Sequence, residues 1–241
     1  MPAFAPLPFF VSGERDKDVG QLCEVLEEYG RRCQFTARWV RPSRADFDPT
    51  QHAGLIVLGD TEDYWATDKR HDRERAWTVA ALDSGRPVLG ICFGAQLLAS
   101  CRHKKRRGSG LKSLSSQHNG VCPVELTEEG QADPVTAPLA NWPFASMSHV
   151  DSFQEPAGAT ALVWSGGGIA RHCEAFRVGP PSAATYGLQF HPEPTREMIV
   201  GEKWFDPMPG EDELGRTVAT GRAVLRAWVV LAISRLVESS S

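Results

Sequence analysis

The sequence has no excess of positive charge and no long uninterrupted apolar segment. Its 30 acidic and 26 basic side chains give a formal net charge of −4. General nucleic-acid and polyanion binders are normally basic, so this balance argues against that class. The longest apolar stretch, 223–237, contains Arg226 and Arg235 and falls short of the ~20 apolar residues that span a membrane. We therefore expect no nucleic-acid partner and no membrane span.

Targeting and cofactor signals are also missing. The opening MPAFAPLPFF lacks a basic start and is broken by prolines, so we expect no secretory signal. The sequence contains no Gly-x-x-x-x-Gly-Lys-Ser/Thr loop, the motif that would indicate ATP binding. The Cys and His residues at 101–103 and 172–173 are too sparse for a zinc site. We expect no cofactor, no metal, a cytoplasmic location and free thiols at all six cysteines.

Neither an internal repeat nor a low-complexity linker divides the 241 residues. The hydrophobic share of 41% and charged share of 23% are ordinary for a globular protein, which excludes global disorder. A chain of this length can bury about 70% of its surface and needs no disulfides for stability. We therefore expect one domain over residues 1–241.

Short apolar runs alternate with helical patterns in the first half of the chain. This indicates an α/β fold with a mostly parallel central sheet flanked by helices. In the second half strands follow one another through turns, which indicates a mixed sheet. Strands are predicted at 7–12, 33–40, 54–59, 87–91, 121–127, 159–165, 174–178 and 184–190. Helices are predicted at 19–30, 68–83, 94–100 and 217–237, the last in a deep groove or partly in an oligomer interface.

The segment from Leu89 to Gln96 carries the strongest chemical signal. A strand runs directly into a helix through Gly90-x-Cys92-x-Gly94, the layout of a nucleophile elbow with cysteine as the nucleophile. Side chains at both glycines would clash in so sharp a turn. The helix N-terminus would favour the reactive thiolate, and the N–H of Phe93 would face an oxyanion. The alternative is a buried structural cysteine.

A candidate base follows 99 residues later in His191-Pro-Glu193. His191 ends a predicted strand, at the sheet edge where elbows present their nucleophiles. Pro192 restricts His191 to extended geometry. Glu193 would hold the imidazole in the tautomer that leaves its other nitrogen facing the thiol. The alternative is an ordinary surface loop.

These two motifs together resemble the class I glutamine amidotransferase family. Residues 80–96 and 186–193 follow the family pattern nearly throughout, and the resemblance covers roughly 53–196. It implies a flavodoxin-like α/β fold with a catalytic Cys92, His191 and Glu193. It also implies hydrolysis of a γ-glutamyl amide through a thioester, which agrees with the chemistry of an activated thiol.

The resemblance implies substrate-facing residues as well. The backbone N–H groups of Gly59 and Phe93 would form the oxyanion hole, and Gln96 would help to hold the substrate's α-amino and α-carboxylate ends. The segment 148–152 resembles the part that recognises the glutamine head group, which places His149 and Asp151 among the binding residues; Asp151 would pair with an ammonium. A polar turn between strands is the alternative for this segment.

Two segments depart from the family pattern. The usual Gly-Gly-Pro of the oxyanion loop is Gly59-Asp60-Thr61 here, and a carboxylate near a developing oxyanion is unfavourable unless it turns away. The basic run 102–107 replaces an apolar stretch. It would attract an acidic partner, an acidic substrate or a nucleotide, or else form a solvated loop.

The sequence leaves several functions open. The first is glutamine hydrolysis that supplies ammonia to a separate synthase, because no acceptor domain fits in the chain. The second is a γ-glutamyl peptidase that cuts a small γ-glutamyl conjugate. A non-catalytic binding protein and a thiol redox sensor are weaker alternatives, because the first would not need Cys92 and His191 and the second leaves His-Pro-Glu unexplained.

Overall fold

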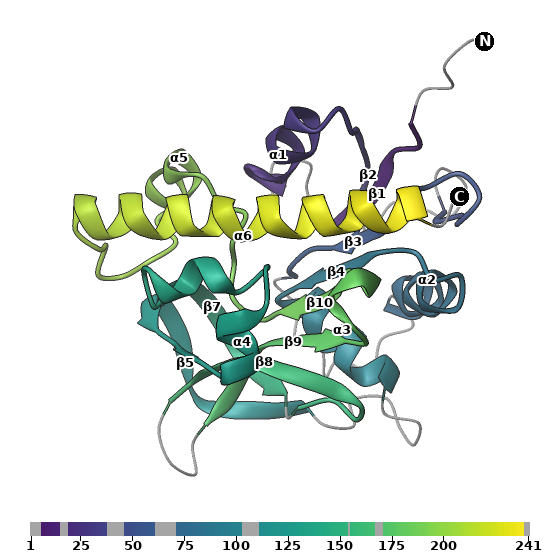
Figure 1. Ribbon diagram of the computed structural model, residues 1–241. Helices are drawn as coiled ribbons and strands as arrows, with labels where there is room; N and C mark the ends of the chain where they lie inside the picture. The colour runs from purple at the N-terminus through teal and green to yellow at the C-terminus, as the bar shows by residue number, and fades with distance from the viewer. Residues whose placement is uncertain are drawn as a thin grey trace.

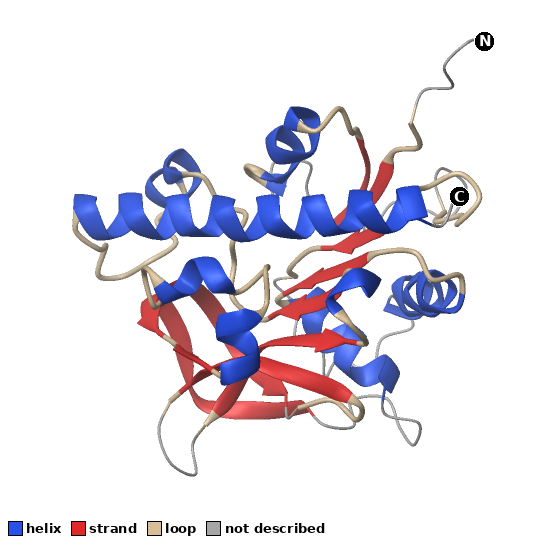
Figure 2. Cartoon of the chain, viewed as in Figure 1, coloured by secondary structure: helices blue, strands red, loops and turns tan. Residues whose placement is uncertain are grey.

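The computed structural model describes residues 6–14, 19–37, 46–60, 71–102, 111–153, 155–166 and 171–238. Within these ranges an eight-stranded sheet has the order β2-β1-β3-β4-β10-β9-β8-β6, and β5 and β7 form a separate ribbon (Figures 1 and 2). The structure is therefore the predicted α/β fold with a mostly parallel central sheet.

Five parallel strands form the first part of the sheet. They are β1 (Phe9–Gly13), β2 (Cys33–Ala37), β3 (Leu55–Val57), β4 (Val88–Ile91) and β10 (Thr185–Leu188). The predicted strands at 54–59 and 87–91 are confirmed with shorter bounds, and the strand predicted at 7–12 is confirmed but begins two residues later and ends one residue later. The order 2-1-3-4 followed by a last parallel strand is that of flavodoxin-like folds, whose ligands bind at the carboxyl ends of the strands.

The remaining strands are antiparallel, which confirms the predicted mixed sheet. Strands β6 (Glu125–Leu126), β8 (Ala159–Ser165) and β9 (His172–Val178) extend the main sheet, while β5 (Leu111–Pro123) pairs with β7 (Phe144–Phe153). The strand β7 was not predicted. The alternative interpretation of 148–152 as a polar turn is wrong, because these residues lie in a strand that pairs along β5.

Helices cover both faces of the parallel strands. On one face α1 (Leu22–Glu28) and α6 (Glu211–Glu238) pack on Phe9 and Val11; on the other, α2 (Asp72–Asp83) and α3 (Phe93–Arg102) pack on Phe10. Because successive strand residues point to opposite faces, β1 contributes to both cores. Two short helices, α4 (Glu128–Ala132) and α5 (Arg196–Gly201), and two 3₁₀ turns, Ala137–Ala140 and Pro181–Ala183, complete the elements.

Helix α6 begins six residues earlier than predicted and lies along the whole molecule in Figure 1. By length and composition it also qualifies as a membrane-spanning helix, so those criteria do not exclude a span as the sequence argument assumed. Its apolar residues have another explanation, since nine of its residues are buried. Among them Trp228 lies edge-on against Phe9 and donates its indole N–H to the carbonyl of Ala184 at 3.0 Å.

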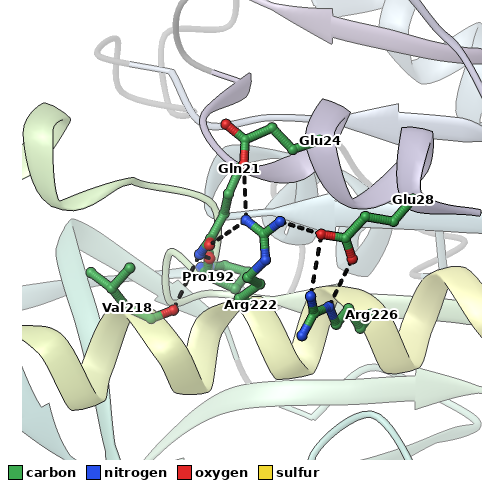
Figure 3. Close-up of polar contacts among 7 residues, drawn as sticks. All are labelled: Gln21, Glu24, Glu28, Pro192, Val218, Arg222 and Arg226. Atoms are coloured by element: carbon green, nitrogen blue, oxygen red, sulfur yellow. Dashed lines mark hydrogen bonds and ion pairs between the residues drawn. The ribbon is translucent and has the colours of Figure 1, made fainter.

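Charged side chains tie α6 to α1 at the surface (Figure 3). The Arg222 guanidinium bonds Glu24 at 2.9 Å and also bonds Glu28. Arg226 donates to Glu28 at 2.9 Å from its Nε. The two arginines hold the pKa of the Glu28 carboxyl below its ordinary value through these hydrogen bonds. The polar stripe of α6 is thus directed at α1.

The expectation of six free thiols is wrong for two of them. Cys23, in α1, and Cys33, at the start of β2, form a disulfide with a Cα–Cα distance of 5.9 Å. The tight turn between helix and strand brings the two residues within bonding range, which spacing alone did not reveal. Cys92, Cys101, Cys122 and Cys173 are free.

Candidate active site

The predicted elbow is present between β4 and α3. Cys92 lies between the last residue of β4 and the first residue of α3, and its backbone is left-handed with φ of 50°. A Cβ on Gly90 would lie 2.4 Å from the carbonyl oxygen of Gly94, and a Cβ on Gly94 would lie 2.0 Å from that of Val57. Only glycine fits at either position, so the close backbone packing holds the thiol at the tip of the turn.

The strand pairing of β10 with β4 brings His191 to the thiol. The N–H of Cys92 donates to the carbonyl of Leu188 at 2.7 Å, and the N–H of His191 donates to the carbonyl of Ser146 at 2.8 Å. The side chains of Cys92 and His191 lie side by side, because a Cβ on Gly59 would be 3.6 Å from Cβ of Cys92 and 3.9 Å from Nε2 of His191. Nδ1 of His191 lies 2.7 Å from Oε1 of Glu193. The three predicted residues therefore form one chain of contacts from thiol to imidazole to carboxylate.

Two negative groups control the protonation of His191. Burial alone lowers the pKa of this imidazole, but the facing charges of Glu193 and Cys92, with their hydrogen bonds, raise it well above its ordinary value. An imidazolium between a thiolate and a carboxylate has its charge compensated on both sides. The protonated imidazole is therefore placed to act as an acid beside the Cys92 sulfur.

Gly59 lies directly beside this pair, as the oxyanion-hole prediction requires. A Cβ at this position would lie 3.0 Å from Cε1 of His191 and 3.6 Å from Cβ of Cys92. Phe93, whose N–H is the other predicted donor, is the first residue of α3 and is buried. Asp60 follows Gly59 and is half-buried, while Thr61 lies outside the described residues.

Gln96 is buried one turn along α3, and a second glutamine joins it to the thiol. The Gln96 amide donates to Oε1 of Gln189 at 3.2 Å and to the carbonyl of Asp151 at 3.3 Å. The Gln189 amide in turn donates to Sγ of Cys92 at 3.5 Å. Sequence reasoning did not assign Gln189 a role. Its place two residues before His191 on an apolar strand was the available signal, because a fully buried glutamine needs polar partners.

The segment of β7 with the other two predicted binding residues passes behind the thiol. The Cys92 thiol faces the carbonyl of Ser148 at 3.9 Å. The next residue, His149, is buried, and Nδ1 of its ring bonds the carbonyl of Asp151 at 2.9 Å. Nε2 of the same ring faces the Glu174 carboxylate at 3.5 Å. Both ring nitrogens of His149 are thus directed at groups of the protein, and Asp151 is buried beside Gln96.

Two further residues that sequence reasoning missed support His191. Trp204 lies edge-on to the imidazole, with ring centroids 5.3 Å apart. Gln21 is buried and donates its amide to the carbonyl of Pro192 at 2.9 Å and to that of Val218 at 3.2 Å (Figure 3). The N–H of Gln21 also donates to the carbonyl of Glu193 at 2.9 Å. No local pattern around Gln21 or Trp204 marks them, because the fold brings both from distant segments.

The basic run 102–107 lies outside the described residues beyond Arg102, the last residue of α3. The fold and the site are those of an α/β protein with a cysteine at a strand–helix elbow. Residues 17–199 match the family described as glutamine amidotransferase class-I. The chain belongs to this family.

The curated relatives include a synthase subunit and a larger synthase, of which this chain matches only a part. The imidazole glycerol phosphate synthase subunit HisH of Salinibacter ruber is 29% identical over 154 residues, which cover 58% of this chain and 69% of that protein. The glutamine-hydrolyzing GMP synthase of Haemophilus ducreyi is 29% identical over 191 residues, or 75% of this chain and 30% of that protein. The chain thus corresponds to less than a third of the GMP synthase.

Solved structures share the fold over nearly the whole chain. A glutamine amidotransferase of Thermotoga maritima has a TM-score of 0.69 and 18% identity, covering 96% of this chain and 98% of that one. A glutamine amidotransferase of Methylobacillus flagellatus has a TM-score of 0.74 and 17% identity, covering 97% and 96%. At this identity the likeness establishes the fold alone.

Proposed function

We propose that this protein hydrolyses the side-chain amide of glutamine through a thioester on Cys92. The observation that carries the proposal is the position of His191, which lies beside Cys92 on one side and 2.7 Å from Glu193 on the other. This arrangement pairs a nucleophile with its acid–base partner and orients that partner through a carboxylate. Membership of a glutamine amidotransferase family supports the choice of substrate.

In the acylation step the Cys92 thiolate attacks the amide carbon of glutamine. The carbonyl π electrons move to oxygen, and the oxyanion is held by the N–H groups of Gly59 and Phe93. As the tetrahedral intermediate collapses, His191 gives its proton to the nitrogen and the C–N bond breaks. Ammonia leaves, and the γ-glutamyl group remains on sulfur. Glu193 keeps the imidazole oriented while its charge changes.

In the deacylation step a water molecule attacks the thioester. Neutral His191 removes a proton from that water, and the same two N–H groups hold the second oxyanion. Collapse expels the Cys92 thiolate and releases glutamate, which restores the ion pair. Gln96 and Asp151 would bind the α-amino and α-carboxylate ends of glutamine, and Gln189 would hold the sulfur in place.

We further propose that the ammonia passes to a separate synthase. The named relatives support this reading, because one is a synthase subunit and the other is a glutamine-hydrolyzing synthase of which this chain matches 30%. The identity of the synthase does not follow from the site.

The test is release of ammonia and glutamate from glutamine by the purified chain. Activity should be lost in Cys92→Ala and retained in Cys101→Ala, since Cys101 is a free thiol at the other end of α3. A thiol-reactive glutamine analogue should label wild type and Cys101→Ala but not Cys92→Ala. Labelling without turnover would mean that the site needs its synthase; absence of both would reject the proposed nucleophile.

A γ-glutamyl peptidase is a second candidate, and Asp60 is the observation that favours it. This carboxylate follows Gly59 directly, where the family resemblance leads us to expect a second glycine. It would suit the cationic or hydrogen-bonding leaving group of a larger conjugate better than ammonia. A γ-glutamyl dipeptide assayed beside glutamine separates the candidates: the peptidase reading requires the higher kcat/KM for the dipeptide, and Asp60→Gly should reduce that preference.

A further inference from the structure

Three side chains from three strands converge behind the candidate active site. His118 on β5 is paired directly opposite His149 on β7, and Glu174 on β9 faces both rings. Nδ1 of His118 lies 3.8 Å from Oε1 of Glu174, and Nε2 of His149 lies 3.5 Å from Oε2. One ligand atom from each residue can be chosen so that all three lie within 4.8 Å of one another.

The facing atoms are buried without satisfied hydrogen bonds. Among the described residues, Nδ1 of His118, Nε2 of His149 and Oε2 of Glu174 are all inaccessible and have no hydrogen-bond partner. The Glu174 side chain is 0% exposed and that of His149 is 1% exposed. A buried carboxylate is costly without a compensating cation. The cluster therefore holds a negative charge and three lone-pair donors around one point.

The tautomer of His149 is set by its second nitrogen. A carbonyl oxygen only accepts, so the 2.9 Å contact from Nδ1 to the carbonyl of Asp151 makes Nδ1 the N–H donor. In the neutral ring the lone pair of Nε2 then points at the carboxylate. Oε1 of Glu174 is held by the Ser165 hydroxyl at 2.5 Å. A histidine that donates its far N–H to a carbonyl, beside a carboxylate fixed by a hydroxyl, is the outer-shell arrangement of metal sites.

We propose that His118, His149 and Glu174 bind a divalent transition-metal ion, with Zn²⁺ as the preferred ion. Two imidazoles and a carboxylate form a ligand set that zinc accepts, with a fourth position for water. Bonds of about 2.0–2.2 Å at tetrahedral angles place ligand atoms about 3.4 Å apart. The two imidazole–carboxylate distances of 3.8 and 3.5 Å run to different oxygens of Glu174, so a bound ion would draw closer together three ligand atoms that lie within 4.8 Å of one another. The His118 side chain is 24% exposed, while its Nδ1, which faces the cluster, is inaccessible.

The ion would connect the ribbon to the main sheet directly behind Cys92. The backbone of Glu174 accepts a hydrogen bond from the N–H of Gln189 at 2.8 Å, and Gln189 contacts the sulfur. The neighbour of His149, Ser148, presents its carbonyl to the same sulfur. A single residue therefore stands between each of these two ligands and the sulfur of Cys92: Gln189 for Glu174, and Ser148 for His149. The role is structural: the ion fixes two walls of the thiol pocket and touches no reacting atom.

No short sequence motif indicates this metal site, because the fold brings its ligands together from distant positions. His118, His149 and Glu174 are separated by 31 and 25 residues, which the numbering gives directly, so no local spacing indicates a site. The expectation of no metal considered only neighbouring residues. It did not consider ligands brought together by strand pairing.

The test uses the full chain, stripped with a chelator, freed of the chelator and titrated with Zn²⁺ alone. We expect one ion per chain, a rise of the Tm by several degrees on saturation, and d–d absorption bands of a low-coordinate site with Co²⁺ in place of Zn²⁺. The same titration in Cys92→Ala should give the same stoichiometry. Loss of the ion in that variant would place it on the thiol and overturn the proposal.

Ligand variants supply the second arm. Glu174→Gln keeps the shape and one acceptor oxygen, and His118→Gln changes a partly exposed ring; each should weaken Zn²⁺ binding at least tenfold while the far-UV circular dichroism of the apo protein is unchanged. The matched control is His172→Gln, whose ring lies edge-on to His118 at 5.4 Å. It should change the affinity less than about threefold. Unaltered binding in Glu174→Gln, or equal weakening in His172→Gln, would overturn the three-ligand assignment. The readout is independent of glutamine hydrolysis, so either proposal can fail alone.

Discussion

The Cβ that Gly59 lacks would lie 3.0 Å from Cε1 of His191. This approach is tighter than ordinary van der Waals contact, and the imidazole is held in place by Glu193 and by the edge of Trp204. A side chain at position 59 therefore has to displace the base or the loop that carries an oxyanion donor. Small displacements of catalytic groups are costly, since about 1 Å can reduce the rate 100-fold.

The first prediction concerns Gly59→Ala. We expect kcat/KM for glutamine to fall by about 10- to 100-fold with little change in Tm, because the substitution moves catalytic groups without opening a cavity. Steady-state kinetics and thermal unfolding measure the two effects. Gly215→Ala is the control, because nothing lies within 4 Å of its added Cβ in α6. It should retain full activity and gain slightly in stability. Equal activity of the two variants would contradict the placement of Gly59.

The second prediction concerns the pH dependence of Glu193→Gln. Burial lowers the pKa of His191, while the Glu193 and Cys92 charges raise it well above the ordinary value. The imidazolium that protonates the leaving nitrogen therefore persists to high pH in the wild type. Removing the carboxylate lowers this pKa, so the basic limb of the kcat/KM profile should move to lower pH. A pH–rate series on both proteins measures the shift.

The control for this series is Glu197→Gln, an exposed carboxylate in the first turn of α5. Its basic limb should coincide with that of the wild type. A Glu193→Gln variant with an unmoved basic limb would show that Glu193 does not set the protonation of His191.

The third prediction concerns the two glutamines behind the thiol. Gln96→Met and Gln189→Met each leave a buried amide without its partner, so each should lower the free energy of unfolding by about 1–3 kcal/mol. Because the side chains share one hydrogen bond, the double variant should lose about 1 kcal/mol less than the sum. Urea unfolding of the three variants measures this coupling. Additive losses would mean that the bond contributes nothing.

Kinetics separate the roles that we propose for the same pair. Gln189→Met should lower kcat, because the amide contacts the sulfur. Gln96→Met should raise KM as well, since Gln96 is proposed to bind the ends of glutamine. An unchanged KM for Gln96→Met would mean that Gln96 only supports Gln189 and does not bind glutamine.

The fourth prediction compares the contacts of Gln21, the residue before α1, with an ion pair between α1 and α6. Gln21→Leu removes the amide donors from the carbonyls of Pro192 and Val218, and the Pro192 carbonyl lies in a buried segment. It should lower the free energy of unfolding by about 2 kcal/mol and reduce kcat, because Pro192 lies between His191 and Glu193. The matched variant Arg226→Ala removes a surface ion pair with Glu28. Its effect should be small and should vanish at high salt. Equal effects of the two variants would contradict a role for Gln21 in positioning His-Pro-Glu.

The elbow could be read from the sequence because its chemistry is local. Gly90, Cys92 and Gly94 meet within five residues, and the steric demand that makes the motif recognisable is the one that the structure shows. His191 and Glu193 were found for the same reason, as a short motif at the end of an apolar strand. These positions depend on the backbone immediately around them.

The supporting residues could not be found in this way. Gln21 reaches Pro192 across 171 residues, and His118 meets His149 only because β5 pairs with β7. The strand β7 itself was missed, because its polar residues resemble a turn when its partner strand is unknown. The Cys23–Cys33 disulfide was missed because the expected cellular location, and not geometry, was used to judge the thiols.

The bond from the N–H of Cys92 to the carbonyl of Leu188 has a consequence for how the protein loses its activity. It extends the ladder between β4 and β10, which both lie in the interior of the sheet. Interior strands open only when the whole structure unfolds, whereas loops open locally at little cost. Nucleophile and base are thus attached to the most cooperative part of the molecule. In increasing denaturant, the thiol and the imidazole should stay together until the global transition, even after peripheral segments have begun to open.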